Sequence, residues 1–499
     1  MLRPSLEEFE SCSQRGNLIP VAREILVDLD TPLSLFRRID DGRTSFLLES
    51  VEGAEKWARY SFIGSGARAS FTAHGREVTW LEWVGGEERS ERITTPGDPL
   101  EFLRAKLRAL HHATPEGMDW PRFIGGAVGM IGYDWVRFVE SLPDPNPDET
   151  GLPTLSFVLP ETVVVFDNIK HTALIVRHLH LQPEDDVRAR YAEAETAIDA
   201  TIATLREPLA PEPPHERVSE PMSVDRSMSE AAYHGIVEQA KRYIEAGDIF
   251  QVVLAQQFRM PQQVDSFRLY RHLRSINPSP YLFYVRLGGA ELVGSSPEIL
   301  VRLEDRAVDV RPIAGTRRRG RSPEDDLAME RELRSDPKER SEHVMLVDLG
   351  RNDVGRVAEI GSVRVNEYAT TERYSHVMHL VSNVQAELRP EFDWLDLLRA
   401  TFPCGTLSGA PKVRAMEIID ELETVGRGPY GGCVGYIDYS GNMDMAITIR
   451  TMVVAEGSIM VHAGAGVVAD SKPELEFKEC VNKAEALVMA IDLAREAGD

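Results

Sequence analysis

Two pairs of glutamates have a spacing that suits metal chemistry. Glu339 and Glu342 are three residues apart, and Glu476 and Glu479 repeat that spacing. On a helix, residues at i and i+3 share one face, so each pair would present two carboxylates in one direction. If the two helices meet, their carboxylates suit Mg²⁺, a hard cation that takes oxygen ligands. In a chain with 80 acidic residues, one such pair alone is more often a solvated helix face, so both interpretations stay open.

Helix start signals precede both pairs. Asp336 followed by Pro337 is typical of an N-cap and a first helical position. Pro473 predicts a second helix start, and Lys483 falls four residues after Glu479 on the same face. We therefore expect helices that begin at residues 337 and 473 and present the glutamates near their N-termini.

A third helix is predicted just before the central strands of the C-terminal half. Ser227-x-x-Glu230 matches a capping box, in which the first side chain caps the helix start. Apolar residues at helical spacing follow: Tyr233, Ile236, Val237, Ala240, Tyr243 and Ile244. Gly247 can then end the helix, because glycine readily adopts the left-handed conformation at that position.

Two strands are predicted around polar residues. Residues 249–255 favour a strand whose alternation puts Gln251, Val253 and Ala255 on one face. Residues 444–450 favour another, which ends in Arg450. A long charged side chain at such a place points to solvent or into a cavity. Because helices and strands mix without regular βαβ alternation, we expect an α+β fold.

Composition sets limits on location and partners. The chain has 499 residues, no apolar run long enough for a membrane span, and four cysteines without a Cys-x-x-Cys motif. Its first residues lack the basic and apolar regions of a signal peptide, so we expect a cytoplasmic protein. The net charge of −24 argues against nucleic-acid binding, which needs a basic surface. An anionic substrate would need concentrated local cations or a metal.

A proline-rich stretch divides the chain. Residues 207–214 contain four prolines, which rule out a helix or a central strand there. We predict an N-terminal part over residues 1–210, a linker over 211–227 and a C-terminal part over 228–499. A chain of this length is large enough for two or more domain-sized units.

Several motifs together resemble the chorismate-utilising enzyme family. They lie, in chain order, at residues 247–251 (GDIFQ), 295–298 (SSPE), 311–317 (RPIAGTR), 345–353 (MLVDLGRND), 404–412 (CGTLSGAPK), 462–466 (HAGAG) and 473–480 (PELEFKEC). The set is very specific in this order and spacing. Within the family the chain is most similar to the branch of anthranilate synthase component I, the chorismate-binding subunit. This resemblance implies antiparallel sheets in a β-sandwich core with surrounding helices, and an active site mainly in the C-terminal part.

The resemblance assigns a role to each candidate site residue. It implies that Mg²⁺ is surrounded by Glu339, Glu342, Glu476 and Glu479, with Glu342 and Glu479 as direct ligands. It implies substrate contacts from Gly315, Thr316, Tyr430, Arg450, Gly464, Ala465, Gly466 and Lys483. Arginine suits this role because its planar fork matches a carboxylate.

The same resemblance implies three catalytic residues. Glu298 matches the general acid at the substrate 4-hydroxyl, since hydroxide leaves poorly without a proton. His379 matches a histidine near the departing side chain, and Thr406 completes the set. His376 with His379 would also suit a metal pair. The chain has no His-Glu-x-x-His motif, which favours a single catalytic histidine.

Two positions decide between branches of the family. Isochorismate and salicylate synthases resemble this chain but have a water-activating lysine at the place of Gln251. Aminodeoxychorismate synthases commonly have a nucleophilic lysine at the place of Ala314. With Gln251 and Ala314, the resemblance implies direct attack by ammonia and release of anthranilate and pyruvate. The alternatives are aminodeoxychorismate synthase component I, of the folate pathway, and a non-catalytic tryptophan-sensing homologue.

The resemblance also implies feedback inhibition and a partner. A tryptophan pocket is expected from Ser50, Pro280, Tyr281, Leu282, Val434 and Tyr436. No glutaminase signature is visible in the chain, so ammonia is expected from a separate glutamine amidotransferase subunit, component II. A heterodimer and a heterotetramer both remain open. No nucleic acid and no membrane partner is expected.

Overall fold

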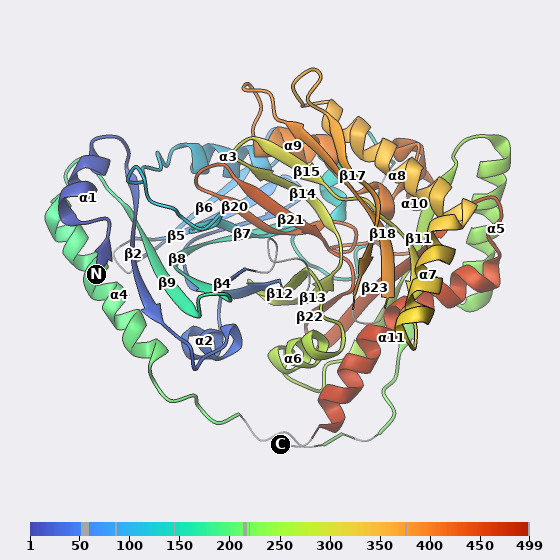
Figure 1. The fold of residues 1–499 in the computed structure, drawn as a ribbon, viewed down its shortest axis with the longest axis horizontal. Helices are drawn as coiled ribbons and strands as arrows, with labels where there is room; N and C mark the ends of the chain where they lie inside the picture. Colours follow the sequence, from blue (N-terminus) through green and yellow to red (C-terminus); the bar gives the residue numbers. More distant parts are fainter. Residues whose placement is uncertain are drawn as a thin grey trace.

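Two antiparallel sheets form the centre of the molecule, and they share their longest strands (Figure 1). The computed structural model describes residues 1–50, 59–84, 87–143, 145–212, 217–218, 220–374 and 377–497. His376, the candidate metal partner of His379, lies outside these ranges.

The first sheet contains strands from both ends of the chain. Its order is β1 (Leu2–Arg3), β2 (Leu18–Leu26), β9 (Thr172–His180), β8 (Leu155–Asp167), β4 (Tyr60–His74), β3 (Ser45–Glu49), β12 (Tyr281–Leu287), β13 (Ala290–Ser296), β22 (Thr451–Ala455), β23 (Ser458–Val467), β11 (Gln251–Pro261) and β10 (Asp225–Arg226). β19 (Gly409–Ala410) also pairs with β11. The strand pairs of this sheet are antiparallel, as expected for an α+β protein.

The second sheet begins on the other halves of β4 and β8. It runs through β6 (Glu87–Thr94), β5 (Glu77–Val84), β4, β8, β7 (Gly126–Ile131), β20 (Cys433–Asp438), β21 (Met443–Ile447), β14 (Ile299–Glu304), β15 (Ala307–Val310), β18 (Val377–Glu387) and β17 (Arg364–Arg373). β16 (Ile313–Arg318) follows β15 along the same edge of β18 and also pairs with β18. A bulge between Ala67 and Ala69 marks where the long strands pass between sheets, since bulges bend a strand.

The two sheets pack face to face around an apolar core. One cluster of buried side chains joins Phe46 and Phe283 of the first sheet to Met130 and Tyr436 of the second. Phe62 meets Tyr436 edge to face, with ring centroids 5.7 Å apart, a favourable aromatic geometry. The predicted α+β fold with an antiparallel sandwich core is confirmed.

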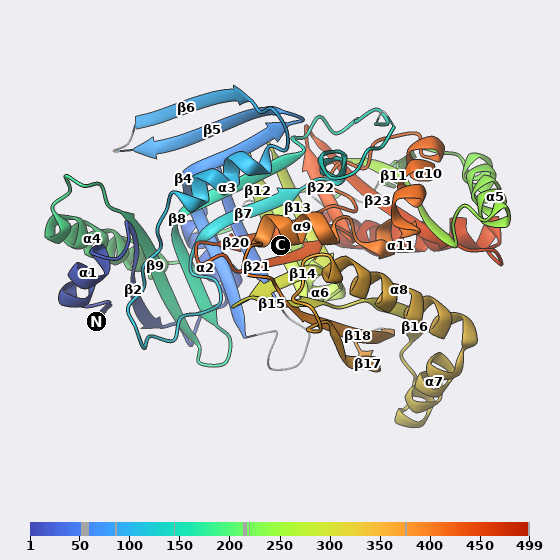
Figure 2. The same cartoon turned by 90° about the horizontal axis from the view of Figure 1, so that it is seen from above.

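Helices cover the outer faces of this sandwich (Figure 2). The first sheet packs against α1 (Leu6–Ser13), α2 (Pro32–Ile39), α4 (Val187–Leu205), α5 (Glu230–Ala246), α6 (Ser266–Ile276), α10 (Lys412–Leu422) and α11 (Pro473–Glu496). The second packs against α3 (Leu100–Arg108), α7 (Pro323–Ser335), α8 (Pro337–Gly355) and α9 (Trp394–Thr401). Short 3₁₀ turns lie at η1 (Tyr133–Phe138) and η2 (Gly405–Leu407).

The predicted starts of α8 and α11 are confirmed, whereas the start of α5 is not. Asp336 accepts from the amides of Lys338 and Glu339, and Pro337 is the first helical residue. The cap of α5 is Ser229, two residues after the predicted one. Ser227 instead accepts the Gln257 amide at the edge of β11, because the short strand β10 pairs with β11 just before it.

The predicted strand over residues 444–450 is too long. β21 covers Met443–Ile447, and the Ile449 amide bonds back to the Ile447 carbonyl. Arg450 has φ of 51°, a left-handed conformation that a strand does not allow. The turn aims the Arg450 side chain into a cavity. The prediction for 249–255 is confirmed in part, since β11 covers Gln251–Pro261.

Strand pairing joins segments from before and after the proline-rich stretch. β3 pairs with β12, and β7 pairs with β20. The division at residues 210 and 228 therefore remains a prediction about sequence segments, and both segments contribute strands to both sheets.

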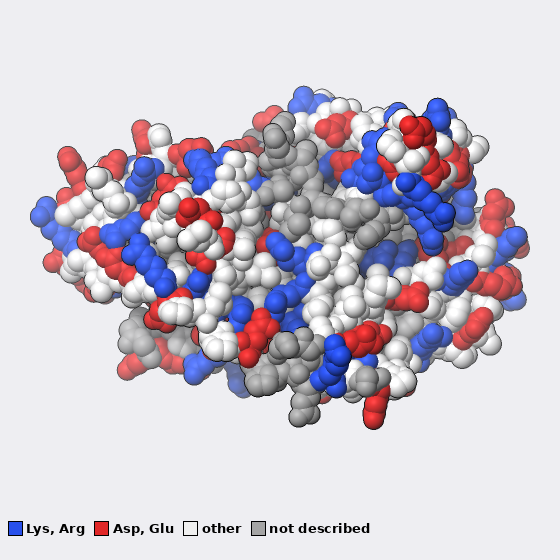
Figure 3. Space-filling model, turned by 60° about the horizontal axis from the view of Figure 1, so that its bottom comes forward, with Lys and Arg blue, Asp and Glu red and all other residues white. Residues whose placement is uncertain are grey.

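The surface and helices show two further properties. None of the helices within the described ranges is long and apolar enough to cross a membrane. On the face shown in Figure 3, acidic and basic side chains are interspersed. The net charge of −24 therefore does not make this face uniformly acidic.

Candidate active site

A cavity of about 490 Å³ lies where α8 and α11 approach the strands β11, β16, β18 and β23. Its walls include nearly every residue that the sequence suggested for metal, substrate or catalysis. These are Glu298, Gly315, Thr316, Glu339, Glu342, His379, Thr406, Tyr430, Arg450, Gly464, Gly466, Glu476, Glu479 and Lys483. Ala465 is the exception, because it does not line the cavity and its side chain is fully buried in the core.

Glu298 lies where the chain crosses from the first sheet to the second, between β13 and β14. Its side chain is 6% exposed. Thr406 donates to Glu298 Oε1 over 3.1 Å, and the Ile313 amide also bonds the carboxylate. Burial raises the pKa of Glu298 to about 8 against the lowering effect of the Thr406 and Cys404 bonds. At neutral pH the group is therefore a carboxylic acid with a proton to give.

His379 is oriented by the bulge of β16. Its Nδ1 lies 2.9 Å from the Gly315 carbonyl and 3.1 Å from Thr316 Oγ1. Gly315 has φ of 67°, which glycine adopts without strain. Burial lowers the pKa of His379, so the ring is neutral at neutral pH. With Nδ1–H donating to the carbonyl, Nε2 has a free lone pair.

Two cations face the cavity from the other side. The Arg450 guanidinium donates to the Lys483 carbonyl over 3.1 Å, and no carboxylate pairs with it among the described residues. Lys483 Nζ bonds the Gly464 carbonyl at 2.9 Å and Glu479 at 2.7 Å. Burial lowers the pKa of Arg450. A buried arginine without a carboxylate partner is suited to an anionic ligand.

The four glutamates share this cavity but each is bonded to a protein group. Glu339 pairs with Arg317 at 2.8 Å, and Glu342 accepts from Gln251 at 3.2 Å. Glu476 accepts from Ser471, and Glu479 pairs with Lys483. Among the described residues no three acidic or metal-ligating side chains converge closely enough to form a metal site.

The electrostatics of these glutamates still fit a cation. Burial raises the pKa of Glu342, and repulsion from Glu339 and Glu479 raises it further. Burial also raises the pKa of Glu476, with Glu479 adding repulsion. Like charges in a confined space favour a positive ion, and carboxylate oxygens are the ligands that Mg²⁺ takes. The donor set therefore fits the predicted metal once the ion pairs with Arg317 and Lys483 rearrange.

The floor of the cavity is formed by β11 and β23. Gln251 and Val253 line it, as their predicted common face requires. Gln251 Oε1 is buried and has no hydrogen-bond partner among the described residues. A Cβ on Gly466 would lie 2.7 Å from Gln251 Nε2, so a larger residue there would displace the end of the Gln251 side chain. Ala314 also lines the cavity, and its methyl group offers no nucleophile there.

Sequence reasoning assigned no role to His462. This residue lines the cavity beside Gly464, and its ring stacks on Tyr430 with centroids 5.5 Å apart. Burial lowers its pKa to about 3, and its Nε2 is buried with no hydrogen-bond partner in the described ranges. The HAGAG motif and the alternation along β23 could have shown that His462 shares the face of Gly464 and Gly466.

A buried ion pair supports the floor from below. Arg427 and Glu423 are 2% and 4% exposed and lie 2.6 Å apart. Arg427 also donates to the carbonyls of Leu407 and Val253 over 2.6 and 2.8 Å. Its guanidinium lies 5.6 Å from the centre of the Tyr430 ring. The Arg427 side chain therefore contacts three separate parts of the cavity wall, at Leu407, Val253 and Tyr430.

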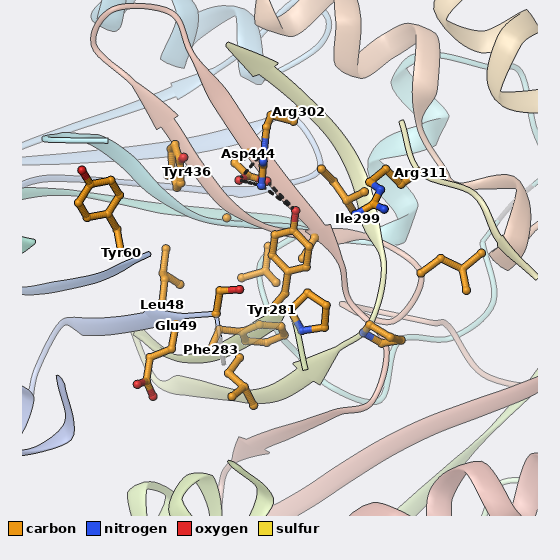
Figure 4. A pocket seen from close by; sticks show the side chains of 18 of the residues that line it. Leu48, Glu49, Tyr60, Tyr281, Phe283, Ile299, Arg302, Arg311, Tyr436 and Asp444 are labelled. Carbon is orange, nitrogen blue, oxygen red and sulfur yellow. Dashed lines mark hydrogen bonds and ion pairs between the residues drawn. The ribbon is translucent and has the colours of Figure 1, made fainter. Parts of the chain in front are cut away.

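A second cavity of about 480 Å³ lies beside the first, between β3 and β12 of one sheet and β14, β20 and β21 of the other. The six residues predicted for a tryptophan pocket line it: Ser50, Pro280, Tyr281, Leu282, Val434 and Tyr436. Arg302 pairs with Asp444 at 2.6 Å and donates to the Tyr281 hydroxyl at 3.0 Å. Figure 4 shows this network on one side of the cavity, while Glu49 points away from it.

The lining of this cavity includes polar atoms that are free to bind a ligand. Within the part of the chain that the structure describes, Ser50 Oγ and Arg122 Nε are buried without a hydrogen bond. Glu49 is not available, because Tyr270 and Arg274 hold its carboxylate at 2.5 and 3.0 Å. An aromatic-walled cavity that also presents the Ser50 hydroxyl and the Arg122 guanidinium suits an aromatic compound with polar substituents.

Comparison with known proteins agrees with the geometry. The family described as chorismate binding enzyme matches residues 44–489. The chain belongs to this family. Anthranilate synthase component 1 of Acetivibrio thermocellus is 46% identical over 501 residues, covering 99% of this chain and 100% of that protein. This full-length similarity groups the chain with the component 1 enzymes, which are large subunits, and confirms the resemblance seen in the motifs.

Solved structures show the same fold. Anthranilate synthase component I from Streptococcus pneumoniae superposes with a TM-score of 0.73 at 36% identity, over 88% of this chain and 93% of that one. The menaquinone-specific isochorismate synthase MenF of Escherichia coli has a TM-score of 0.70 at 20% identity, over 97% and 98%. At that identity the second likeness shows the fold alone.

Proposed function

We propose that the chain is the chorismate-binding subunit of anthranilate synthase, which catalyses the first committed step of tryptophan biosynthesis. Chorismate and ammonia would give anthranilate, pyruvate and water. The observation that carries the proposal is one cavity that combines a protonated buried acid, Glu298, with a buried cation, Arg450, which has no carboxylate partner among the residues that the structure describes. A substrate with carboxylates and a poor leaving group needs both.

Substrate binding follows from the cations. Arg450 and Lys483 would bind the ring carboxylate, with the backbone amides of Gly464 to Gly466 completing the site. Tyr430 lines the same wall. The glycines allow close approach of the backbone to the ligand. Arg450 need not break an ion pair to bind the substrate, because its only described hydrogen bond is to a backbone carbonyl.

Magnesium would be held by Glu342 and Glu479, with Glu339 and Glu476 in support. When bound, it would supply positive charge that offsets repulsion between the glutamates and a dianionic substrate. Binding requires Glu479 to release Lys483 and so frees that cation for the substrate.

In the first step the ammonia nitrogen forms a bond to C2 of the ring, the double bonds shift, and the C4–O bond breaks. Glu298 delivers its proton to the departing oxygen, which leaves as water, and the added nitrogen, positively charged after the attack, releases one proton to become the amine. General acids of this kind accelerate reactions by about 10²–10⁴-fold. Thr406 and the Ile313 amide hold the carboxylate that results.

In the second step the C2 proton is removed and the C3–O bond breaks. The electron pair from the C–H bond completes the aromatic ring, and the side chain leaves and takes up a proton to become pyruvate. The neutral Nε2 of His379 is the available base, because Nδ1 faces the Gly315 carbonyl.

The chemistry of two side chains favours this product over the alternatives. Gln251 cannot activate water as a lysine does, and Ala314 cannot form a covalent bond to substrate. Product analysis is the test: purified protein with chorismate, Mg²⁺ and ammonium should form fluorescent anthranilate. Persistent aminodeoxychorismate would indicate the folate enzyme, and tryptophan binding without turnover would indicate a sensor.

Regulation and partnership extend the proposal. Tryptophan would occupy the second cavity, with Ser50 and Arg122 bonding its polar groups. Ammonia would come from a glutamine amidotransferase, component II, because the relatives are named component 1, which implies a further component. Mixing the chain with such a subunit should make glutamine an effective nitrogen source; failure at any ratio would remove the partner assignment.

A further inference from the structure

The two cavities are separated by a wall that is one residue thick at two places. Pro297 and Ile313 line both cavities. Each is followed in the chain by a residue of the candidate active site, Glu298 and Ala314. The wall between the cavities therefore consists of the same chain segments that position Glu298 and Ala314 in the candidate active site.

Ile313 links the two sides directly. Its side chain lines the second cavity beside Val381, its partner across the β16–β18 ladder. Its backbone N–H bonds the Glu298 carboxylate in the first cavity. A displacement of this residue on one side must therefore change a hydrogen bond on the other.

Tyr374 provides a second link of the same kind. It lines the second cavity, and its ring packs edge-on against His379 with centroids 5.6 Å apart. His379 lines the first cavity. Each of the two candidate proton-transfer groups thus touches one residue whose other side faces the second cavity.

We propose that Ile313 and Tyr374 are positioning residues that couple the second cavity to the orientation of Glu298 and His379. The inference rests on the proposed function, since its ligand is the aromatic amino acid proposed for that cavity. A ligand shifts such an equilibrium only through contacts that differ between two arrangements. An aromatic ring in contact with Ile313 and Tyr374 supplies that difference, because Ile313 lies in the wall shared with the first cavity and the Tyr374 ring contacts His379.

The expected coupling is large enough to measure. Typical couplings between two sites change the affinity at each by a factor of about 5–150. By reciprocity, tryptophan and chorismate should weaken each other's binding by one common factor. This factor can be measured without turnover.

The test measures the tryptophan Kd of full-length protein by calorimetry, with and without saturating chorismate and Mg²⁺, and without ammonium. In wild type, the two Kd values should differ by a factor of about 5–150. Ile313→Ala keeps the backbone N–H but removes the side chain that faces the ligand. This variant should still bind tryptophan, and the factor should fall to about 1–3. Tyr374→Leu should lower it as well.

Two controls separate coupling from pocket shape. Ile313→Leu keeps an apolar side chain of similar volume and should retain the wild-type factor. Val434→Ala alters the opposite wall of the second cavity and should weaken tryptophan binding while leaving the factor unchanged. If Ile313→Ala does not fold, Ile313→Val replaces it, and its factor should lie between those of wild type and Tyr374→Leu.

An unchanged factor in Ile313→Ala, or an equal fall in Val434→Ala, overturns the inference. Absence of tryptophan binding in wild type overturns it together with the proposed regulation. A wild type that shows the coupling but forms no anthranilate refutes the proposed reaction alone, so the two failures are distinguishable.

Discussion

Thr406 Oγ1 lies 3.1 Å from Glu298 Oε1 and donates its hydrogen to it. Thr406 belongs to η2, and Glu298 to the crossover between β13 and β14. The bond stabilises the carboxylate, yet burial outweighs it and keeps the proton in place at neutral pH. The pair therefore holds an acid that is protonated before the reaction and has a partner for its charge afterwards.

Replacing that acid should remove the first chemical step. We expect Glu298→Gln to lower kcat by about 10²–10⁴-fold, with the fold retained by circular dichroism. The acid form of wild type is present below a pKa of about 8, so kcat should fall as pH rises through that value. Rates must be compared at constant free ammonia, because ammonium also titrates. A flat profile with an active Glu298→Gln variant contradicts the assignment.

Removing a metal ligand should change the magnesium requirement. Glu479→Ala should abolish Mg²⁺-dependent turnover, because a proposed direct ligand is lost. Glu474 is exposed on the same helix and does not line the cavity, so Glu474→Ala is the matched control. Titration of Mg²⁺ against anthranilate formation checks both. Wild-type activity of Glu479→Ala at limiting Mg²⁺ would reject the ligand.

Arg317 should influence metal affinity from outside the site. Its guanidinium pairs with Glu332, Asp336 and Glu339 at 2.8–2.9 Å and so fixes the first turn of α8. We expect Arg317→Gln to lower Mg²⁺ affinity by about 10-fold or more, as is typical when a residue that orients a metal ligand is lost. Calorimetric Mg²⁺ titration measures this directly. Arg318→Gln, at an exposed neighbour outside the cavity, should leave the affinity unchanged; equal effects of both changes would count against the role.

Filling the second cavity with a larger side chain should prevent tryptophan inhibition without inhibiting the enzyme itself. Ser50→Phe would remove the Ser50 hydroxyl and fill part of the cavity that it lines, and it should relieve tryptophan inhibition while leaving turnover unchanged. Inhibition curves with ammonium as the nitrogen source check this. Inhibition that persists at the wild-type tryptophan concentration would mean that tryptophan binds elsewhere.

The buried pair beneath the active site should be costly to break. Arg427→Met leaves Glu423 buried without its cation, which typically costs about 3–5 kcal/mol. We expect a clear fall in the thermal midpoint, measured beside wild type. The double variant Arg427→Met/Glu423→Leu removes both charges and should recover much of the loss. A single variant as stable as wild type would show that water reaches the carboxylate.

The sequence predicted local features well and long-range ones poorly. Pro337 and Pro473 marked the helix starts because proline fits the first helical turn. The prediction of Ser227 as the cap was wrong because Ser229, two residues later, can also cap the helix. The pairing of β10 with β11 places Ser227 before the helix and leaves Ser229 as the cap. The division of β4 and β8 between two sheets has no local signal, since it depends on partners far along the chain.

The same distinction holds for the sites. The motifs, through the family resemblance, predicted which residues belong to each site. Apart from Ala465, these residues line the two cavities. The shared wall at Ile313 and the ring of Tyr374 against His379 could not be predicted, because side-chain contacts between strands depend on register. The partners that hold the glutamates, Arg317 and Lys483, are also visible only in three dimensions.

The ladders between β3 and β12 and between β7 and β20 set a condition on biosynthesis. Leu48 pairs with Phe283, and Met130 pairs with Val434. Until those later residues leave the ribosome, the growing chain exposes two strand edges with unsatisfied backbone groups. Such edges are prone to join other chains. The hazardous period for this protein is thus its own synthesis, and it ends only when the last strands arrive to cover the first.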